Sequence, residues 1–80
     1  MIYPQPESDL NLNPLVLGAE VISNIKKRRK DPIIEDLLQD FLKNDKRRNH
    51  RLFFDTLITL FLLGIIDEEN YRIKLKNGNN

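Results

Sequence analysis

The sequence predicts a mainly α-helical domain in which three helices are followed by a small two-stranded β-hairpin. Two helix starts are marked by a polar capping residue directly before a proline, and a long apolar segment supplies the third helix. After that segment, the apolar residues change from helical spacing to the alternation of a strand. A chain of 80 residues is enough for one domain, and it has no cysteine for a disulfide.

The chain divides into a short arm, one domain and a short tail. Residues 1–12 hold two prolines and no helical period, and we expect an extended N-terminal arm. The domain is predicted to span residues 13–76, and residues 77–80 are predicted to form a flexible tail. The net charge is only +1, but the positive charge is concentrated in residues 26–51. Any attraction to nucleic acid is therefore local.

The first helix is predicted to run from Pro14 to Lys30. Asn13 is its expected N-cap, and Gly18 allows a neighbouring element to approach closely. The helix is predicted to end in the basic run Lys26–Lys30, whose cations suit the negative C-terminal end of a helix.

The second helix is predicted to run from Pro32 to Lys43, with Asp31 as its cap. Its apolar residues recur at three- and four-residue spacing, and acidic and amide residues occupy the opposite side. This is the pattern of an amphipathic helix. A polar and basic linker, residues 44–48, follows it.

The third helix is predicted over roughly Asn49 to Leu63 and is closed by Gly64 in the left-handed conformation. Its apolar side chains cover an arc of about 200°, whereas a surface helix needs a stripe of little more than 100°. One side of the helix can be buried in the domain's own core, and the other side needs a partner. The only polar ridge consists of Asp55, Thr56 and Thr59.

The hairpin is predicted from Ile65 onwards, with a turn at residues 67–70 and an alternating strand at residues 71–75. Three helices followed by a hairpin is the element order of a winged helix-turn-helix domain. The side chains expected to face the core are Tyr71, Ile73 and Leu75.

The sequence lacks the residue patterns that catalysis needs. The only histidine is His50, and there is no Gly-rich phosphate loop and no metal-ligand spacing. Asp36 and Asp40 lie one helical turn apart, but a solvated helix side explains them better than a bound cation does. We predict a protein that is not an enzyme and has no cofactor, metal site or small-molecule substrate.

Two basic clusters could contact duplex DNA through phosphates, without sequence preference and with steep salt dependence. A solvated basic surface is the alternative. Base reading is disfavoured because the third helix offers few hydrogen-bonding side chains and residues 67–69 are acidic. The candidate nucleic-acid residues are Lys26, Lys27, Arg28, Arg29, Lys30, Lys46, Arg47, Arg48 and Arg51.

The surplus apolar surface of the third helix predicts a protein interface. If about four large side chains stay outside the core, their burial gives about 6–12 kcal/mol of gross drive for association. The alternative is that the other helices, the hairpin and the arm cover this surface. The candidate interface residues are Phe53, Phe54, Ile58, Leu62 and Leu63.

The same apolar segment is too short and too charged for a membrane span. The first residues are acidic and contain proline, unlike a signal peptide. We expect a cytoplasmic protein without membrane contact.

Parts of the first and third helices resemble the small middle components of bacterial ABC-three-component systems, in particular middle component 6. The resemblance spans about residues 10–75 and is carried by LGAEVI at 17–22, FDxL at 54–57 and LFLLGIID at 60–67.

This resemblance implies partners rather than a chemistry. Such systems combine an ABC-type ATPase, related to SMC and repair ATPases, with a variable effector such as a nuclease. They are associated with Lamassu-type defence against phages or plasmids. The implied role is a non-catalytic adaptor between the two subunits. A free-standing winged-helix transcriptional regulator that binds DNA is the alternative function.

Overall fold

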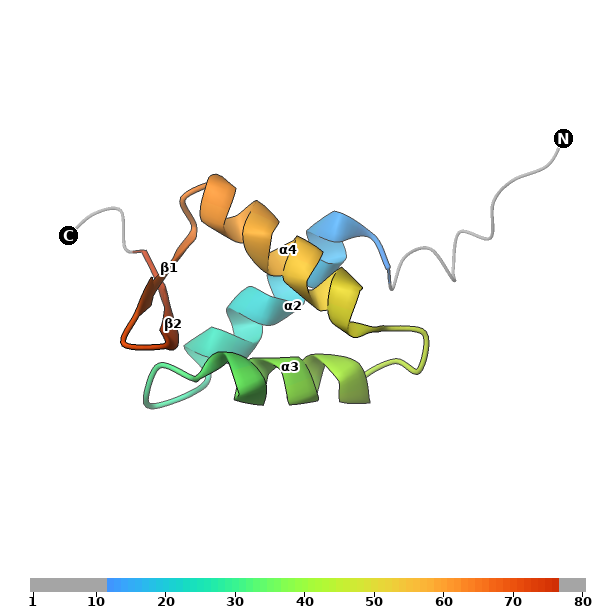
Figure 1. The fold of residues 1–80 in the computed structure, drawn as a ribbon, viewed down its shortest axis with the longest axis horizontal. Coiled ribbons are helices and arrows are strands. Elements are labelled where there is room, and N and C mark those ends of the chain that lie inside the picture. The colour runs from blue at the N-terminus through green and yellow to red at the C-terminus, as the bar shows by residue number, and fades with distance from the viewer. Residues whose placement is uncertain (1–11, 77–80) are drawn as a thin grey trace, which may run out of the picture.

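The computed structural model describes residues 12–76, which form three helices followed by one antiparallel hairpin (Figure 1). This order confirms the predicted fold class, a mainly helical, winged-helix-like arrangement. The predicted tail, and all of the predicted arm except Leu12, lie outside the described residues. The elements are α2 (Pro14–Lys26), α3 (Ile34–Lys43), α4 (His50–Leu62), β1 (Ile66–Glu69) and β2 (Arg72–Leu75).

Helix α2 lies at the centre of the fold, with α3 and α4 crossing it and the hairpin at one end of the molecule (Figure 1). Helix α4 packs against α2, α3 and β1, and α2 also packs against β2. All five elements therefore contribute to one core. Its buried apolar residues are Leu17, Val21, Ile25, Leu37, Leu38, Phe41, Phe53, Leu57, Leu60, Ile66 and Ile73.

The start of α2 is confirmed, but its predicted end is wrong. The side chain of Asn13 caps the helix by accepting a 2.8 Å hydrogen bond from the backbone N–H of Leu15. The helix ends at Lys26, four residues before the predicted end. The remaining basic residues belong to the loop that leads to α3. Pro32 disfavours a helical conformation in Asp31, so α2 and α3 do not form one continuous helix.

The start of α3 is also corrected. The helix begins after Ile33, which makes no side-chain cap, so Asp31 is not the cap. Ile33 instead pairs with Arg72 in an isolated β-bridge, and the carbonyl of Pro32 accepts a 2.8 Å hydrogen bond from the N–H of Ile73. The hairpin uses the backbone of these two residues, which therefore stay extended.

Helix α4 follows the prediction closely. Asn49 is its N-cap, and Gly64 has a φ of +76° just after its end. The N–H of Ile65 donates to the carbonyl of Leu60 at 2.9 Å, and the N–H of Gly64 donates to the carbonyl of Phe61 at 3.0 Å. These two bonds form a Schellman motif, the helix ending that glycine favours.

The hairpin turn is shorter than predicted, and Tyr71 does not face the core. Asn70 and Tyr71 form the turn with φ values of +54° and +67°, as in a type I′ turn, and Tyr71 is 82% exposed. The acidic residues 67–69 therefore belong to β1 rather than to the turn. Ile73 is fully buried and Leu75 is partly buried, in agreement with the prediction.

Replacing Tyr71 by glycine is expected to stabilise the protein. A tyrosine in the left-handed region is strained, and its exposed ring contributes little packing, so Tyr71→Gly should raise the free energy of unfolding by about 1 kcal/mol. Urea denaturation followed by circular dichroism measures the change. Asn70→Gly is the matched control and should change stability by only a few tenths of a kcal/mol, because asparagine tolerates this conformation. A loss of stability in Tyr71→Gly would contradict the strain argument.

Candidate protein-interaction surface

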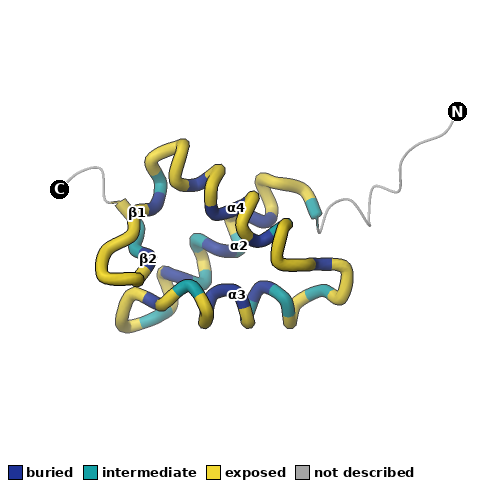
Figure 2. The backbone as a smooth tube through the Cα atoms, in the orientation of Figure 1, coloured by how far each residue is buried: buried dark blue, intermediate teal, exposed yellow. Residues whose placement is uncertain are grey.

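Helix α4 carries two apolar stripes, one inside the core and one outside it (Figure 2). The inner stripe consists of Phe53, Leu57 and Leu60, which are at most 4% exposed. The side chains of the second stripe are between 36% and 82% exposed. We name this second set the outer stripe: Phe54, Ile58, Phe61 and Leu62.

Phe53 was predicted as an interface residue but belongs to the core. Its ring is fully buried and lies 5.3 Å from the ring of Phe41, measured between centroids. It also meets Phe54 edge to face, with the centroids 5.1 Å apart. Phe54 is 40% exposed, so the boundary of the core runs between these two neighbours. The other predicted interface residues are all exposed: Phe54, Ile58, Leu62 and Leu63.

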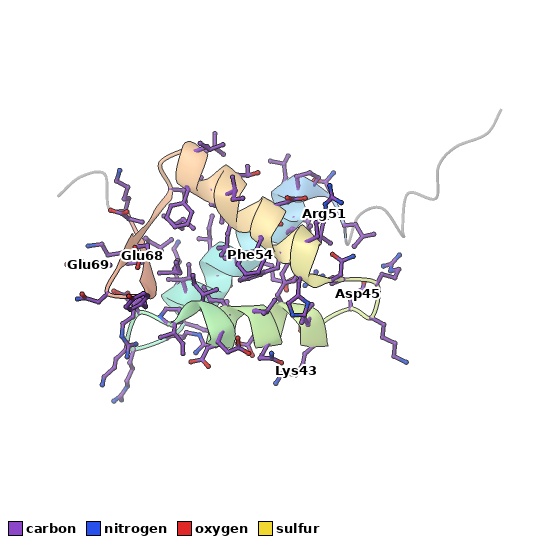
Figure 3. All side chains as sticks on the ribbon, in the orientation of Figure 1. Lys43, Asp45, Arg51, Phe54, Glu68 and Glu69 are labelled. Atoms are coloured by element: carbon purple, nitrogen blue, oxygen red, sulfur yellow. The ribbon has the colours of Figure 1, made fainter. Side chains whose placement is uncertain are left out.

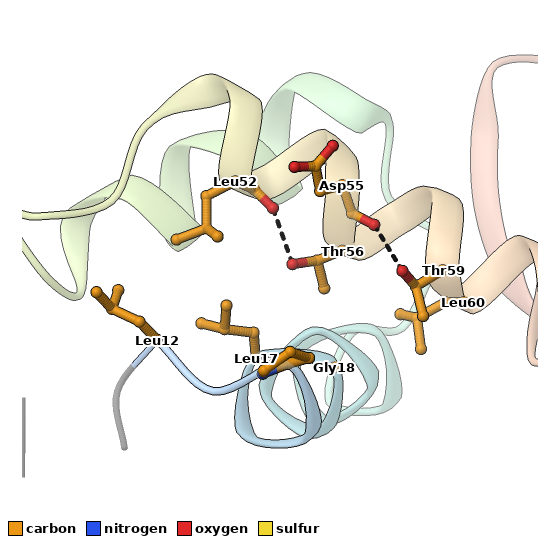
Figure 4. Close-up of a pocket in the computed structure, with 9 residues that line it drawn as sticks. Leu12, Leu17, Gly18, Leu52, Asp55, Thr56, Thr59 and Leu60 are labelled. Atoms are coloured by element: carbon orange, nitrogen blue, oxygen red, sulfur yellow. Dashed lines mark hydrogen bonds between the residues drawn. The ribbon is translucent and has the colours of Figure 1, made fainter. Parts of the chain in front are cut away.

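Leu63 lines a different surface from the outer stripe, an apolar groove between α2 and α4. One part of this α2–α4 groove has a volume of about 210 Å³ and includes Leu15, Ile22 and Leu63. The adjoining part, of about 200 Å³, is drawn in Figure 4 and reaches Leu12 and Leu52. Four residues line both parts of the groove: Pro14, Gly18, Thr59 and Leu60.

The predicted polar ridge of α4 offers little to a nucleic-acid base. Thr56 is buried, and its hydroxyl donates to the carbonyl of Leu52 at 2.8 Å (Figure 4). The hydroxyl of Thr59 donates to the carbonyl of Asp55 at 2.9 Å. Both threonine hydroxyls therefore donate their proton to a backbone carbonyl of α4 and not to a nucleic-acid base.

Arg48 was predicted as a nucleic-acid residue, but it is a buried brace between elements. Its guanidinium makes two hydrogen bonds to the carboxylate of Glu20, at 2.6 and 2.9 Å. It also donates to the carbonyl of Phe41 at 3.1 Å and lies 4.5 Å above the ring of that residue. The Arg48 side chain is only 3% exposed, so it does not reach a phosphate on the surface.

Hydrogen bonds from arginine also set the ionisation of the carboxylates around this brace. Arg48 lowers the pKa of Glu20, and this effect outweighs burial, which raises it. Burial raises the pKa of Asp40, but hydrogen bonds from Asn24 and Arg28 outweigh it, and the result is a lowered pKa. A side-chain hydrogen bond from Arg47 lowers the pKa of Asp45.

The exposed cations among the predicted nucleic-acid residues fall into two separate patches. The first follows α2, and the second lies between α3 and the first turn of α4, so the length of α3 separates them (Figure 1). A helix of 10 residues is about 15 Å long. Arg28 and Arg47, from opposite patches, are ion-paired with Asp40 and Asp45, respectively. The exposed members of the predicted set are Lys26, Lys27, Arg29 and Lys30 in the first patch and Lys46, Arg47 and Arg51 in the second.

Within residues 12–76, no group of three histidine, cysteine, aspartate or glutamate side chains could hold a metal ion. In the same part of the chain, no helix is long and apolar enough to cross a membrane.

Comparisons of this chain with known protein families, with curated proteins and with solved structures found no match. The resemblance to ABC-three-component middle components therefore remains a prediction from the sequence.

Sequence reasoning missed several exposed apolar residues. Leu15 is 83% exposed, and Leu15, Ala19 and Ile22 follow each other at four- and three-residue spacing along one side of α2. That spacing was a readable signal for a second apolar stripe on this helix. Phe61 belonged to the broad apolar arc predicted for the third helix and could not be assigned to its exposed side. The alternating pattern of the strand placed Tyr71 in the core, although it is exposed.

Breaking the Glu20–Arg48 pair is expected to destabilise the protein in a pH-dependent way. Glu20→Gln should lower the free energy of unfolding by about 2 kcal/mol at neutral pH, because it leaves a buried guanidinium without its counter-charge. The folded-state pKa of Glu20 is below its ordinary value of 4.5, so the pair stabilises the protein above that pH and loses its effect as the pH falls further. The variant and the unmodified protein should therefore converge in acid.

Urea denaturation at a series of pH values measures this convergence. Glu35→Gln is the matched control, since Glu35 is exposed and its carboxylate bonds only to Gln39 among the described residues. Equal effects of the two substitutions at neutral pH would contradict a structural role for Arg48.

Proposed function

We propose that the chain is a cytoplasmic, non-catalytic adaptor subunit with a winged-helix-like fold. In this proposal it links an ABC/SMC-like ATPase to an effector, such as a nuclease, in a bacterial complex for antiphage or antiplasmid defence. The observation that carries the proposal is the exposure of Phe54, Ile58 and Leu62 on α4 and of Leu63 at its C-cap. The identity of the partners rests on the sequence resemblance described above.

The exposed apolar surface is large enough to contribute substantially to association. The exposed fractions of the four side chains add up to between two and three whole side chains. Their complete burial gives about 4–7 kcal/mol of gross stabilisation. Association itself costs about 4–15 kcal/mol, so a stable complex needs further contacts beside these four. Phe61 and the α2–α4 groove are available for them.

An adaptor that joins two proteins needs two separate binding surfaces. The outer stripe and the α2–α4 groove meet this need because they lie on different sides of α4. Ile58 and Leu62 point away from the core, whereas Leu63 lies beside α2. Each surface exposes large apolar side chains, as protein-binding sites commonly do.

The same geometry argues against the alternative function, a sequence-reading regulator. In winged helix-turn-helix proteins, the helix before the hairpin reads bases through polar side chains. Helix α4 instead exposes Phe54, Ile58 and Leu62, together with the carboxylate of Asp55. Acidic side chains also occupy β1. An adaptor that binds proteins therefore fits these side chains better than a DNA reader does.

An aspartate on the outer stripe is expected to abolish partner binding without unfolding the chain. Leu62→Asp and Phe54→Asp should each prevent co-purification with the ATPase subunit of the proposed complex, because a buried, unpaired carboxylate is costly. Circular dichroism should show unchanged helical content. Tyr71→Asp is the control, since it adds the same charge at an exposed apolar residue in the hairpin turn. Unfolding of both outer-stripe variants would show that the stripe is part of the core.

Duplex DNA is expected to bind weakly, without sequence preference and with steep salt dependence. The variant Lys27→Glu/Arg29→Glu should reduce binding equally for all sequences, because it removes phosphate contacts of the first patch. Fluorescence anisotropy at several salt concentrations measures this. A regulator would instead prefer one sequence by a factor on the order of 10³ and lose that preference in Thr59→Ala. That result would exclude the adaptor function.

A further inference from the structure

We propose that the outer stripe binds the outer stripe of a second copy of this chain. In the resulting dimer, the two α4 helices run antiparallel, and the twofold axis passes beside Ile58. The inference rests on the proposed function only in taking the outer stripe to be an interface. In the dimer a second copy takes the place of one partner on the outer stripe, and the two α2–α4 grooves, one on each copy, are left for the ATPase and the effector. Outer-stripe variants then lose the ATPase because the subunit that binds it is the dimer.

The spacing of the outer stripe suits a twofold axis. Phe54 precedes Ile58 by four residues, and Leu62 follows it by four. Rotation by 180° about an axis at Ile58 therefore places Phe54 of one copy opposite Leu62 of the other. A twofold interface must be self-complementary in this way. It also buries the same stripe on both copies, which doubles the apolar surface removed from water.

The charges at the ends of α4 favour the antiparallel orientation. The first turn of α4 contains no acidic residue, and the last turn contains no basic one, so its own side chains do not offset the helix dipole. Arg51 is exposed in the first turn, and its guanidinium forms no hydrogen bond or ion pair with another described residue. At the other end of α4, β1 brings the exposed carboxylate of Asp67.

Antiparallel pairing brings each Arg51 to the negative end of the other copy's α4, the end from which the chain leads into β1 and Asp67. Figure 3 shows Arg51 at one end of α4 and the hairpin, marked by Glu68 and Glu69, at the other. Parallel pairing would place the two Arg51 side chains together, and these like charges repel each other. The apolar centre with charged ends therefore fits a second copy in one direction only.

Single cysteines can map the pairing, because the natural chain contains none. Ile58→Cys should form a disulfide-linked dimer under mild oxidation, because the axis brings the two copies of this residue together. Phe54→Cys should cross-link with Leu62→Cys when the two variants are mixed, and neither should cross-link alone. Leu15→Cys is the control, an equally accessible apolar position outside the stripe, and should stay monomeric on a denaturing gel. Cross-linking of Phe54→Cys with itself would overturn the antiparallel arrangement.

The mass in solution provides a second test. Sedimentation equilibrium of the unmodified chain should give twice its 9.5 kDa, with dissociation on dilution. Ile58→Asp should give the single-chain mass at every concentration, with unchanged helical content, whereas Leu15→Asp should remain dimeric. Arg51→Glu should weaken the dimer about fivefold, because two exposed ion pairs are lost in a twofold dimer. Arg51→Glu/Asp67→Arg should restore it. Failure of this restoration would overturn the proposed contact between the ends of the helices.

Failure of this inference is distinguishable from failure of the adaptor function. A single-chain mass for the unmodified protein overturns the dimer and leaves the co-purification test of the adaptor to be decided separately. A dimer that binds neither the ATPase nor an effector overturns the adaptor and supports the dimer. Persistence of the dimer in Ile58→Asp would show that the copies associate through another surface, and would also overturn the inference.

Discussion

The burial of the inner stripe of α4 is the interaction on which the other elements depend. Phe53, Leu57 and Leu60 lie at the junction of α2, α3 and β1, and α4 packs against all three. Gly18 of α2 is buried at this junction, and a Cβ atom there would make an ordinary van der Waals contact of 3.4 Å with the side chain of Leu60. A helix has one side facing the core, so satisfying this junction leaves the second apolar stripe outside. The wide apolar arc of α4 therefore has two consequences: one stripe forms the core, and the other stripe is exposed.

Part of the positive charge that the sequence suggests for nucleic-acid binding instead stabilises the fold. Arg48 joins α2 to the end of α3 through Glu20 and the carbonyl of Phe41. This removes one of the predicted nucleic-acid residues from the surface. The remaining exposed cations are divided by the length of α3, which weakens any continuous phosphate-binding face. Apolar surface is therefore the more prominent feature available to a partner.

Most parts of the fold that depend on residues close in sequence were predicted correctly. The errors lie where contacts between distant residues determine the structure. Asn13 and Gly64 act within one turn of their own helices, and both were predicted correctly. Asn49 was predicted as the first residue of the third helix and is its N-cap. The start of α3 depends on a bridge from Ile33 to Arg72, which no local pattern reveals. The same limit applies to the site. Periodicity showed an arc that was too wide, but only the packing around Phe53 decides which part of it is core.

The division of α4 into two stripes separates stability from association. A polar substitution on the inner stripe leaves an unsatisfied group in the core, and both folding and binding are lost. The same substitution at Ile58 or Leu62 meets water in the free chain and is costly only when a partner covers it. Charged groups at the ends of the stripe add direction rather than much affinity, because exposed ion pairs are weak. Affinity therefore resides in the apolar centre, and orientation resides in Arg51 and the hairpin.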